Sequence, residues 1–219
     1  MLAIIWKDLV LEARSRETVA SLFVLGVLVL VIFNFAVDIT PDDVADVAPG
    51  ILWIAIVFSA TLALGRAFAI ERENGCMTAL LLAPVDRGLV FFAKLLVNVI
   101  VLLVFEALLL PFFVLFFPVG AGAALPELVA VLIAGTIGLA AVGTLFALAA
   151  FGTRARELML PLLILPLQIP LLIAAVRSTS LVLAGTALGD LGAWGTLLVS
   201  FDVVFVTAGW LAFEFMVVD

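Results

Sequence analysis

The feature that most constrains this chain is the recurrence of long apolar runs. "TVASLFVLGVLVLVIFNFAV" and "LLVNVIVLLVFEALLLPFFVLFF" are two of them. Apolar runs of more than about 18 residues are typical of membrane-spanning helices. Composition points the same way, because 67% of the 219 residues are hydrophobic and 12% are charged, whereas about 25% are charged in an average soluble domain. The sequence therefore predicts an all-α, polytopic membrane protein.

Six transmembrane helices can be placed on the chain. The fifth is short and contains Pro161, Pro166 and Pro170. Proline removes a backbone donor and crowds the preceding turn, so we expect this helix to be kinked or broken. The six spans are expected at Thr18 to Val37, Gly50 to Ile70, Leu89 to Phe117, Leu128 to Phe151, Leu160 to Val176 and Trp194 to Val218.

Lysine and arginine predict the orientation, because short cytoplasmic loops are enriched in both. One side of the membrane receives only Arg177, so both termini are expected in the cytoplasm. Trp53 and Trp194 are expected in the aromatic belt at the outer boundary, and Trp6 in the belt at the inner one. The basic residues assigned to the cytoplasmic side are Lys7, Arg14, Arg16, Arg66, Arg72, Arg87, Lys94, Arg154 and Arg156.

The first 17 residues have the pattern of an amphipathic helix lying in the membrane interface. Apolar residues at helical spacing occupy one side of this helix, and charged residues lie largely elsewhere. A plain extension of the first span is the alternative interpretation. The apolar side comprises Leu2, Ile5, Trp6, Leu9, Val10 and Ala13, and the charged residues are Lys7, Asp8, Glu12 and Arg14.

Two carboxylates, Glu106 and Asp202, fall within predicted spans. A charge at the bilayer centre costs at least about 2.5–3.5 kcal/mol, so these groups should face protein or water. We expect Glu106 to be protonated or hydrogen-bonded, with Gln168 or Asn98 as its partner. A role of both carboxylates in a translocation path is the alternative.

Other residues of the spans are assigned structural roles. Lys94 and Arg66 lie near the cytoplasmic ends and can extend to the surface there. Two pairs of small residues at a spacing of four predict a close helix contact, either within the subunit or between two subunits. These pairs are Ala134 with Gly138 and Gly143 with Ala147.

The residue inventory argues against an enzyme. The phosphate-binding loop of many ATPases needs a Gly-Lys pair, but Lys7 follows Trp6 and Lys94 follows Ala93. The chain has no histidine and a single cysteine, so we expect neither a metal site nor a Ser-His or Cys-His nucleophile. Any energy for transport must then come from another source.

The polar stretch "AIERENGCMTALLLAPVDRG" interrupts the apolar sequence between the second and third spans. "EREN" begins the cytoplasmic segment, Asn74-Gly75 is a turn signal, and Pro84 ends the short helix-forming run "CMTALLLA". That run is too short to cross a membrane, so it should dock into lipid headgroups or into the groove of a partner. Glu73, Asp86 and Arg87 could set the register of such a contact by charge pairing. A surface loop dipping into the interface is the alternative.

These residues also carry a family resemblance. "FAIERENGCMTALLLAPVDRGLVFFAKLL" resembles the corresponding loop of the CcmB family, the haem exporter protein B of cytochrome c maturation. "WKDLVLEARSRE", "PGILWIA", "RELMLPLLILPLQIPLLIAAV" and "FDVVFVTAGWLAFEFMVVD" resemble other parts of that family. The specific words are Glu-Arg-Glu and Leu-Leu-Leu-Ala-Pro-Val-Asp-Arg.

The resemblance implies a single permease domain over residues 1–219, with the fold of an ABC-2-like exporter permease in a bacterial inner membrane. It further implies two copies paired with two copies of the cytoplasmic ATPase CcmA, together with CcmC, CcmD and the haem chaperone CcmE. Haem would belong to the complex and ATP to the partner, with no cofactor on this chain alone and no nucleic acid.

The segment 71–88 would then be the coupling segment, whose helix, roughly Gly75 to Ala83, sits in the ATPase groove. ATP hydrolysis could drive haem through this subunit or release the loaded chaperone, and we favour release. The implied contacts are Glu71, Arg72, Glu73, Met77, Leu80, Leu81, Leu82, Pro84, Asp86 and Arg87. A stand-alone secondary transporter or channel with Glu106 and Asp202 as proton sites is the competing hypothesis.

Overall fold

The protein is an all-helical bundle in a computed structural model, which describes residues 5–10, 17–37, 43–73, 87–117, 119, 121–149 and 156–216. Six of its helices are long and apolar enough to cross a membrane, which confirms the predicted fold class. They are α2 (Glu17–Ala36), α3 (Val44–Glu73), α5 (Arg87–Phe116), α6 (Ala121–Ala149), α7 (Arg156–Leu183) and α8 (Gly192–Met216). A 3-10 helix, η1 (Leu188–Asp190), precedes α8, and residues 5–10 form a short N-terminal helix.

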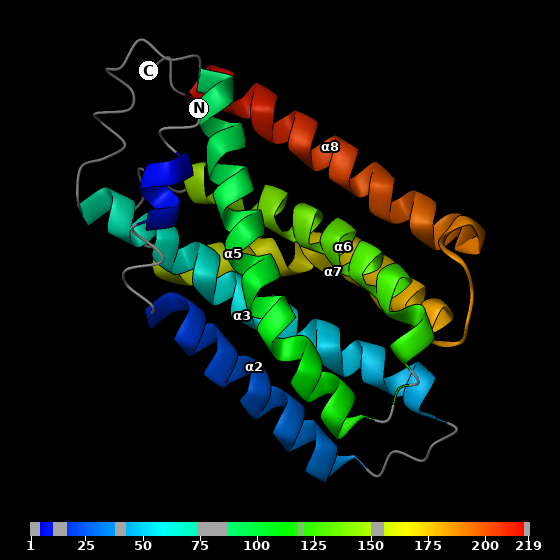
Figure 1. The fold of residues 1–219 in the computed structure, drawn as a ribbon. Helices are drawn as coiled ribbons and strands as arrows, with labels where there is room; N and C mark the ends of the chain where they lie inside the picture. The colour runs from blue at the N-terminus through cyan, green and yellow to red at the C-terminus, as the bar shows by residue number, and fades with distance from the viewer. Residues whose placement is uncertain are drawn as a thin grey trace.

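The bundle is arranged around α6, which contacts α3, α5, α7 and α8. Helix α2 packs against α3 and α5 at one edge, and α8 forms the opposite edge (Figure 1). The beginning of α5 and the end of α8 lie at the same end of the bundle (Figure 1). The six candidate spans match the number of crossings predicted from the sequence.

Small residues of α6 allow its neighbours to approach closely. A Cβ atom on Gly135 would clash with the indole ring of Trp53, and one on Gly143 would clash with the side chain of Leu64. Both contacts come from α3 of the same chain. Gly143 belongs to the predicted packing face, which is therefore used within the subunit at this position, whereas Gly135 was not among the predicted residues.

Trp53 is buried in the core of the bundle and does not face the surroundings of the protein, so its assignment to the aromatic belt is wrong. It is 1% exposed, and its indole N–H donates to Thr179 Oγ1 on α7 at 2.9 Å. The error arises because α3 begins at Val44 and not near Gly50. Val44, Ala48 and Ile51 are buried at helical spacing, and their burial stabilises the helical conformation of this part of the chain.

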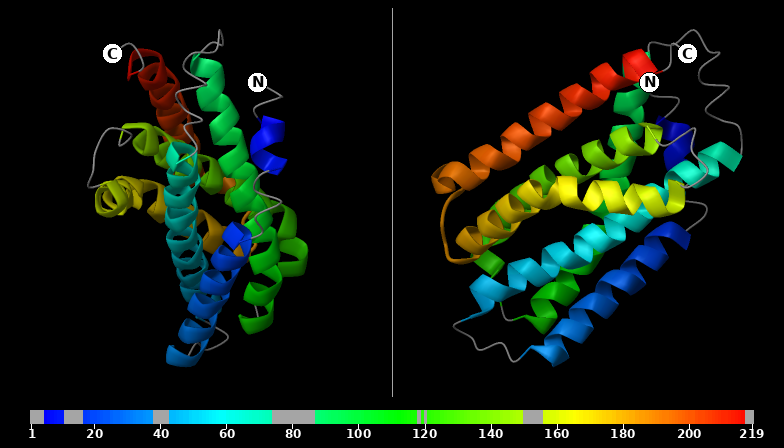
Figure 2. Two further views of the ribbon diagram at one scale, coloured as in Figure 1. Left: turned by 90° about the vertical axis from the view of Figure 1, so that its left-hand side faces the viewer. Right: turned by 180° about the vertical axis from the view of Figure 1, so that it is seen from behind.

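Helix α7 is longer than the expected fifth span. It runs continuously from Arg156 to Leu183 and is not broken at its prolines, but it bends along its length (Figure 2), in agreement with the expected kink. Packing against α3, α6 and α8 supports it, and neighbouring helices are what allow prolines in membrane spans. Its extension places Arg177 on an exposed face inside the helix and not in a loop.

Candidate functional site

The predicted coupling segment is framed by helices whose backbones the structure describes. Glu71, Arg72 and Glu73 are the last residues of α3, so that helix continues beyond the expected end at Ile70. Arg87 is the first residue of α5. Met77, Leu80, Leu81, Leu82, Pro84 and Asp86 lie outside the described residues.

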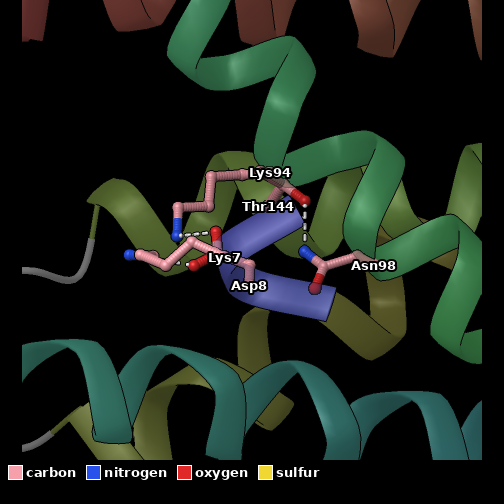
Figure 3. A network of polar contacts seen from close by, with 5 residues as sticks. All are labelled: Lys7, Asp8, Lys94, Asn98 and Thr144. Carbon is pink, nitrogen blue, oxygen red and sulfur yellow. Dashed lines mark hydrogen bonds and ion pairs between the residues drawn. The ribbon is translucent and has the colours of Figure 1, made fainter. Parts of the chain in front are cut away.

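Helix α5 follows the coupling segment in the chain and carries polar residues that contact other elements. Its Lys94 ammonium lies 2.6 Å from Asp8 Oδ2 on the N-terminal helix. Lys7 approaches the other oxygen of the same carboxylate at 3.0 Å, so two cations converge on Asp8 (Figure 3). The Lys94 side chain is 5% exposed and that of Asp8 12%, so the expectation that Lys94 extends to the surface is wrong.

Apolar contacts accompany this ion pair. Ile5 is buried in a cluster with Ala93 and Val97 of α5, and Leu9 packs against the same cluster. Ile5, Asp8 and Leu9 are spaced as one face of a helix. Trp6 is on another face and is 73% exposed. The N-terminal helix therefore docks on α5 through a face that includes a charged residue, which the amphipathic pattern had placed apart from the apolar side.

Two further side chains of α5 bind α6. The Asn98 side-chain amide donates to Thr144 Oγ1 at 2.9 Å, one helical turn from Lys94 (Figure 3). Deeper in the span, Thr136 Oγ1 donates to Glu106 Oε1 at 2.6 Å. The expected partners of Glu106 were Gln168 and Asn98, and this expectation is wrong. The second oxygen of Glu106 is buried without a hydrogen-bond partner among the described residues.

The other predicted polar residues approach α6 from α7 and α8. The Gln168 amide donates to the Leu139 carbonyl at 3.4 Å. A Cβ atom on Gly138 would lie 2.6 Å from Asp202 Oδ1, so this carboxyl rests directly on the α6 backbone. Gln168 Oε1 and Asp202 Oδ1 are buried without hydrogen-bond partners within the described part of the chain. Residues 136–144 of α6 thus meet polar side chains from three helices.

The two carboxyls do not form a pair. Glu106 binds α6 at Thr136, and Asp202 rests on it at Gly138. Residues two positions apart in an α-helix, such as Thr136 and Gly138, are separated by about 200° around its axis, so the carboxyls face nearly opposite sides of α6. No group of three His, Cys, Asp or Glu side chains that could hold a metal is found among the described residues.

Sequence reasoning missed Asp8, Thr136 and Thr144 as partners of the predicted polar residues. The spacing of Lys94 and Asn98 does place both on one face of α5. No local pattern links residue 8 to residue 94 or residue 106 to residue 136, because these contacts depend on how the helices pack. Thr136 and Thr144 are also ordinary residues of an apolar span.

Comparison with known proteins gives a consistent result. A sequence model of the family described as CcmB protein matches residues 1–217. The chain is 34% identical over 173 residues to "Heme exporter protein B" of Paracoccus denitrificans, covering 79% of each chain. It is 32% identical over 173 residues to the protein of that name from Rhodobacter capsulatus, again covering 79% of each. The Pseudomonas aeruginosa protein of that name is 31% identical over 160 residues, which are 73% of this chain and 71% of that protein.

Proposed function

The chain belongs to the CcmB family, and on this premise we propose that it is the membrane subunit of a haem exporter driven by a separate ATPase. The match over residues 1–217 is the observation that carries the proposal, together with relatives named heme exporter protein B. A subunit of an ATP-driven transporter without a Gly-Lys pair in its sequence needs a partner to bind and hydrolyse ATP.

Coupling to that ATPase is assigned to residues 71–88. α3 leads into this segment and α5 leaves it, and α5 is bonded to both the N-terminal helix and α6. A displacement imposed on the segment would therefore reach the centre of the bundle through α5. We propose CcmA as the ATPase, in a complex of two copies of each chain with CcmC and CcmD, in the bacterial inner membrane with both termini cytoplasmic.

The work done by this complex is proposed to be release of the haem-loaded chaperone CcmE. The chain contains neither histidine nor tyrosine, two of the residue types that commonly bind haem iron through an axial position. A subunit with so few iron ligands is better suited to supplying force than to holding the iron. Haem is then associated with the complex, and its ligands come from a neighbouring subunit.

Unpartnered atoms of buried carboxyls favour a second candidate, a stand-alone transporter with Glu106 and Asp202 as proton sites. Their placement near opposite sides of α6 argues against a direct relay between them. Proton relays in transporters use chains of neighbouring ionisable residues. The first proposal therefore explains more of the molecule.

Neutral substitutions separate the two candidates. We expect Glu106→Gln and Asp202→Asn, singly and together, to retain at least about half of the mature c-type cytochrome made by the native chain. An amide oxygen can still accept the hydrogen bond from Thr136, whereas an amide does not take up and release a proton near neutral pH. The measurement is complementation of a strain lacking the chain, with membrane levels of each variant as the control. Loss of maturation at normal levels of the double variant would favour the proton-site candidate.

A further inference from the structure

We infer that the N-terminal helix is a positioning element for α5, held there by the Asp8–Lys94 ion pair, so that the two helices move as one body during coupling. This inference rests on the proposed function, because the movement is the one that the ATPase would impose through residues 71–88. It assigns to Asp8 and Lys94 a role in transmission.

The contact is placed where such a movement would enter the bundle. Ala93, Lys94 and Val97 lie in the second and third turns of α5, soon after its first residue, Arg87. The N-terminal helix lies beside this part of α5 in both Figure 1 and Figure 2. Any shift of the coupling segment that moves the beginning of α5 therefore acts directly on the contact.

The chemistry of the contact favours a fixed geometry. Lys94 is nearly buried and Asp8 is mostly buried, and their charged atoms are 2.6 Å apart. Removing one member of a buried pair leaves an uncompensated charge, which is far more disruptive than neutralising both members. Lys7 also contacts Asp8, but its side chain is 44% exposed, and an exposed pair contributes little.

The same turns of α5 connect onward to α6. Asn98 is one turn beyond Lys94 and donates to Thr144. The N-terminal helix and α6 are thus each joined by a polar contact to the same part of α5. A displacement of this part of α5 relative to α6 would alter the alignment of Asn98 with Thr144.

The docking itself can be tested by cross-linking the full chain in native membranes. The chain for this test carries Cys76→Ser together with Ile5→Cys and Ala93→Cys. The two introduced cysteines would be oxidised to a disulfide. Adding Asp8→Asn is expected to lower the initial cross-linking rate about tenfold, because Lys94 is left without its counter-charge. Asp8→Asn with Lys94→Gln should restore the rate, and Lys7→Gln should leave it unchanged. Equal rates in the presence and absence of Asp8→Asn would overturn the inference.

Transmission is tested on the same variants by ATP turnover in the purified complex, corrected for the amount of ATPase that remains bound. With its introduced cysteines reduced, the Asp8→Asn variant should retain the ATPase yet lose most of the ATP turnover that depends on this subunit. Forming the disulfide should restore that turnover. In the chain that carries the three cysteine substitutions and keeps Asp8, forming the disulfide should leave turnover as it was before oxidation. Full turnover in reduced Asp8→Asn, or loss of turnover on cross-linking the chain that keeps Asp8, would refute the inference. Absence of any ATPase from the native complex would instead refute the proposed function, while the cross-linking rates would still report on the docking.

Discussion

Replacing both Leu81 and Leu82 with aspartate is expected to abolish retention of the ATPase while leaving the chain inserted in the membrane. The two leucines belong to the proposed coupling segment, where they would fill an apolar groove of the partner. Interface hot spots of this kind contribute about 2–4 kcal/mol each, and every ~1.4 kcal/mol changes the dissociation constant tenfold. Two charges in a desolvated groove should therefore weaken binding by at least about a thousandfold.

The measurement is the ratio of ATPase to membrane subunit after purification in mild detergent. The matched control is methionine at both positions, which keeps the apolar volume and should retain the partner. Insertion would be checked by extraction of the variant from washed membranes. An unchanged ratio in the aspartate variant would show that residues 81 and 82 are not part of the ATPase contact.

The chain purified alone is expected to show no haem spectrum of the type given by two axial protein ligands, in either the oxidised or the reduced state. Haem iron is generally held by His, Cys, Met or Tyr, and this chain has no His, no Tyr, one Cys and four Met. Met159 is near the beginning of α7, and Met216 is the last residue of α8. Cys76 and Met77 belong to the coupling segment, and Met1 is terminal. In the proposed topology all five therefore lie toward the cytoplasm, away from the surface where the chaperone would receive haem.

Absorption spectra of the chain titrated with haem test this expectation. Added haem should partition loosely into the apolar helices and detergent, whereas a complex containing the haem-handling partner should give the ligated spectrum. A stable, stoichiometric, six-coordinate spectrum from this chain alone would contradict the account. Met159→Leu and Met216→Leu would then be the first variants to examine.

The fold class follows from sequence because apolar length and charge distribution act locally. A run of about 20 apolar residues has few alternatives to a spanning helix, and all six spans were found this way. Helix ends were less predictable. α3 begins early because Val44 and Ala48 are buried by tertiary packing, and α7 passes its prolines because neighbouring helices support it.

The sequence predicted that buried polar residues need contacts, but it did not predict which residues provide them. The cost of an unpaired carboxyl in the membrane indicated that Glu106 needed a partner, yet Thr136 was not among those expected. The amphipathic pattern placed Asp8 among the charges away from the apolar side, and only the packing of that helix on α5 brings it to Lys94. Long-range pairs of this kind depend on the arrangement of helices, which a single sequence does not encode in any local pattern.

The most direct test of the proposed function is purification of the native chain, tagged at its carboxyl end, from its own membrane in mild detergent. The account predicts that a cytoplasmic ATPase subunit co-elutes in a one-to-one ratio and that its ATP turnover differs from that of the ATPase alone. The contradictory result is a chain that elutes without any ATPase and, reconstituted in vesicles, moves solute in response to a proton gradient in a manner abolished by Glu106→Gln or Asp202→Asn.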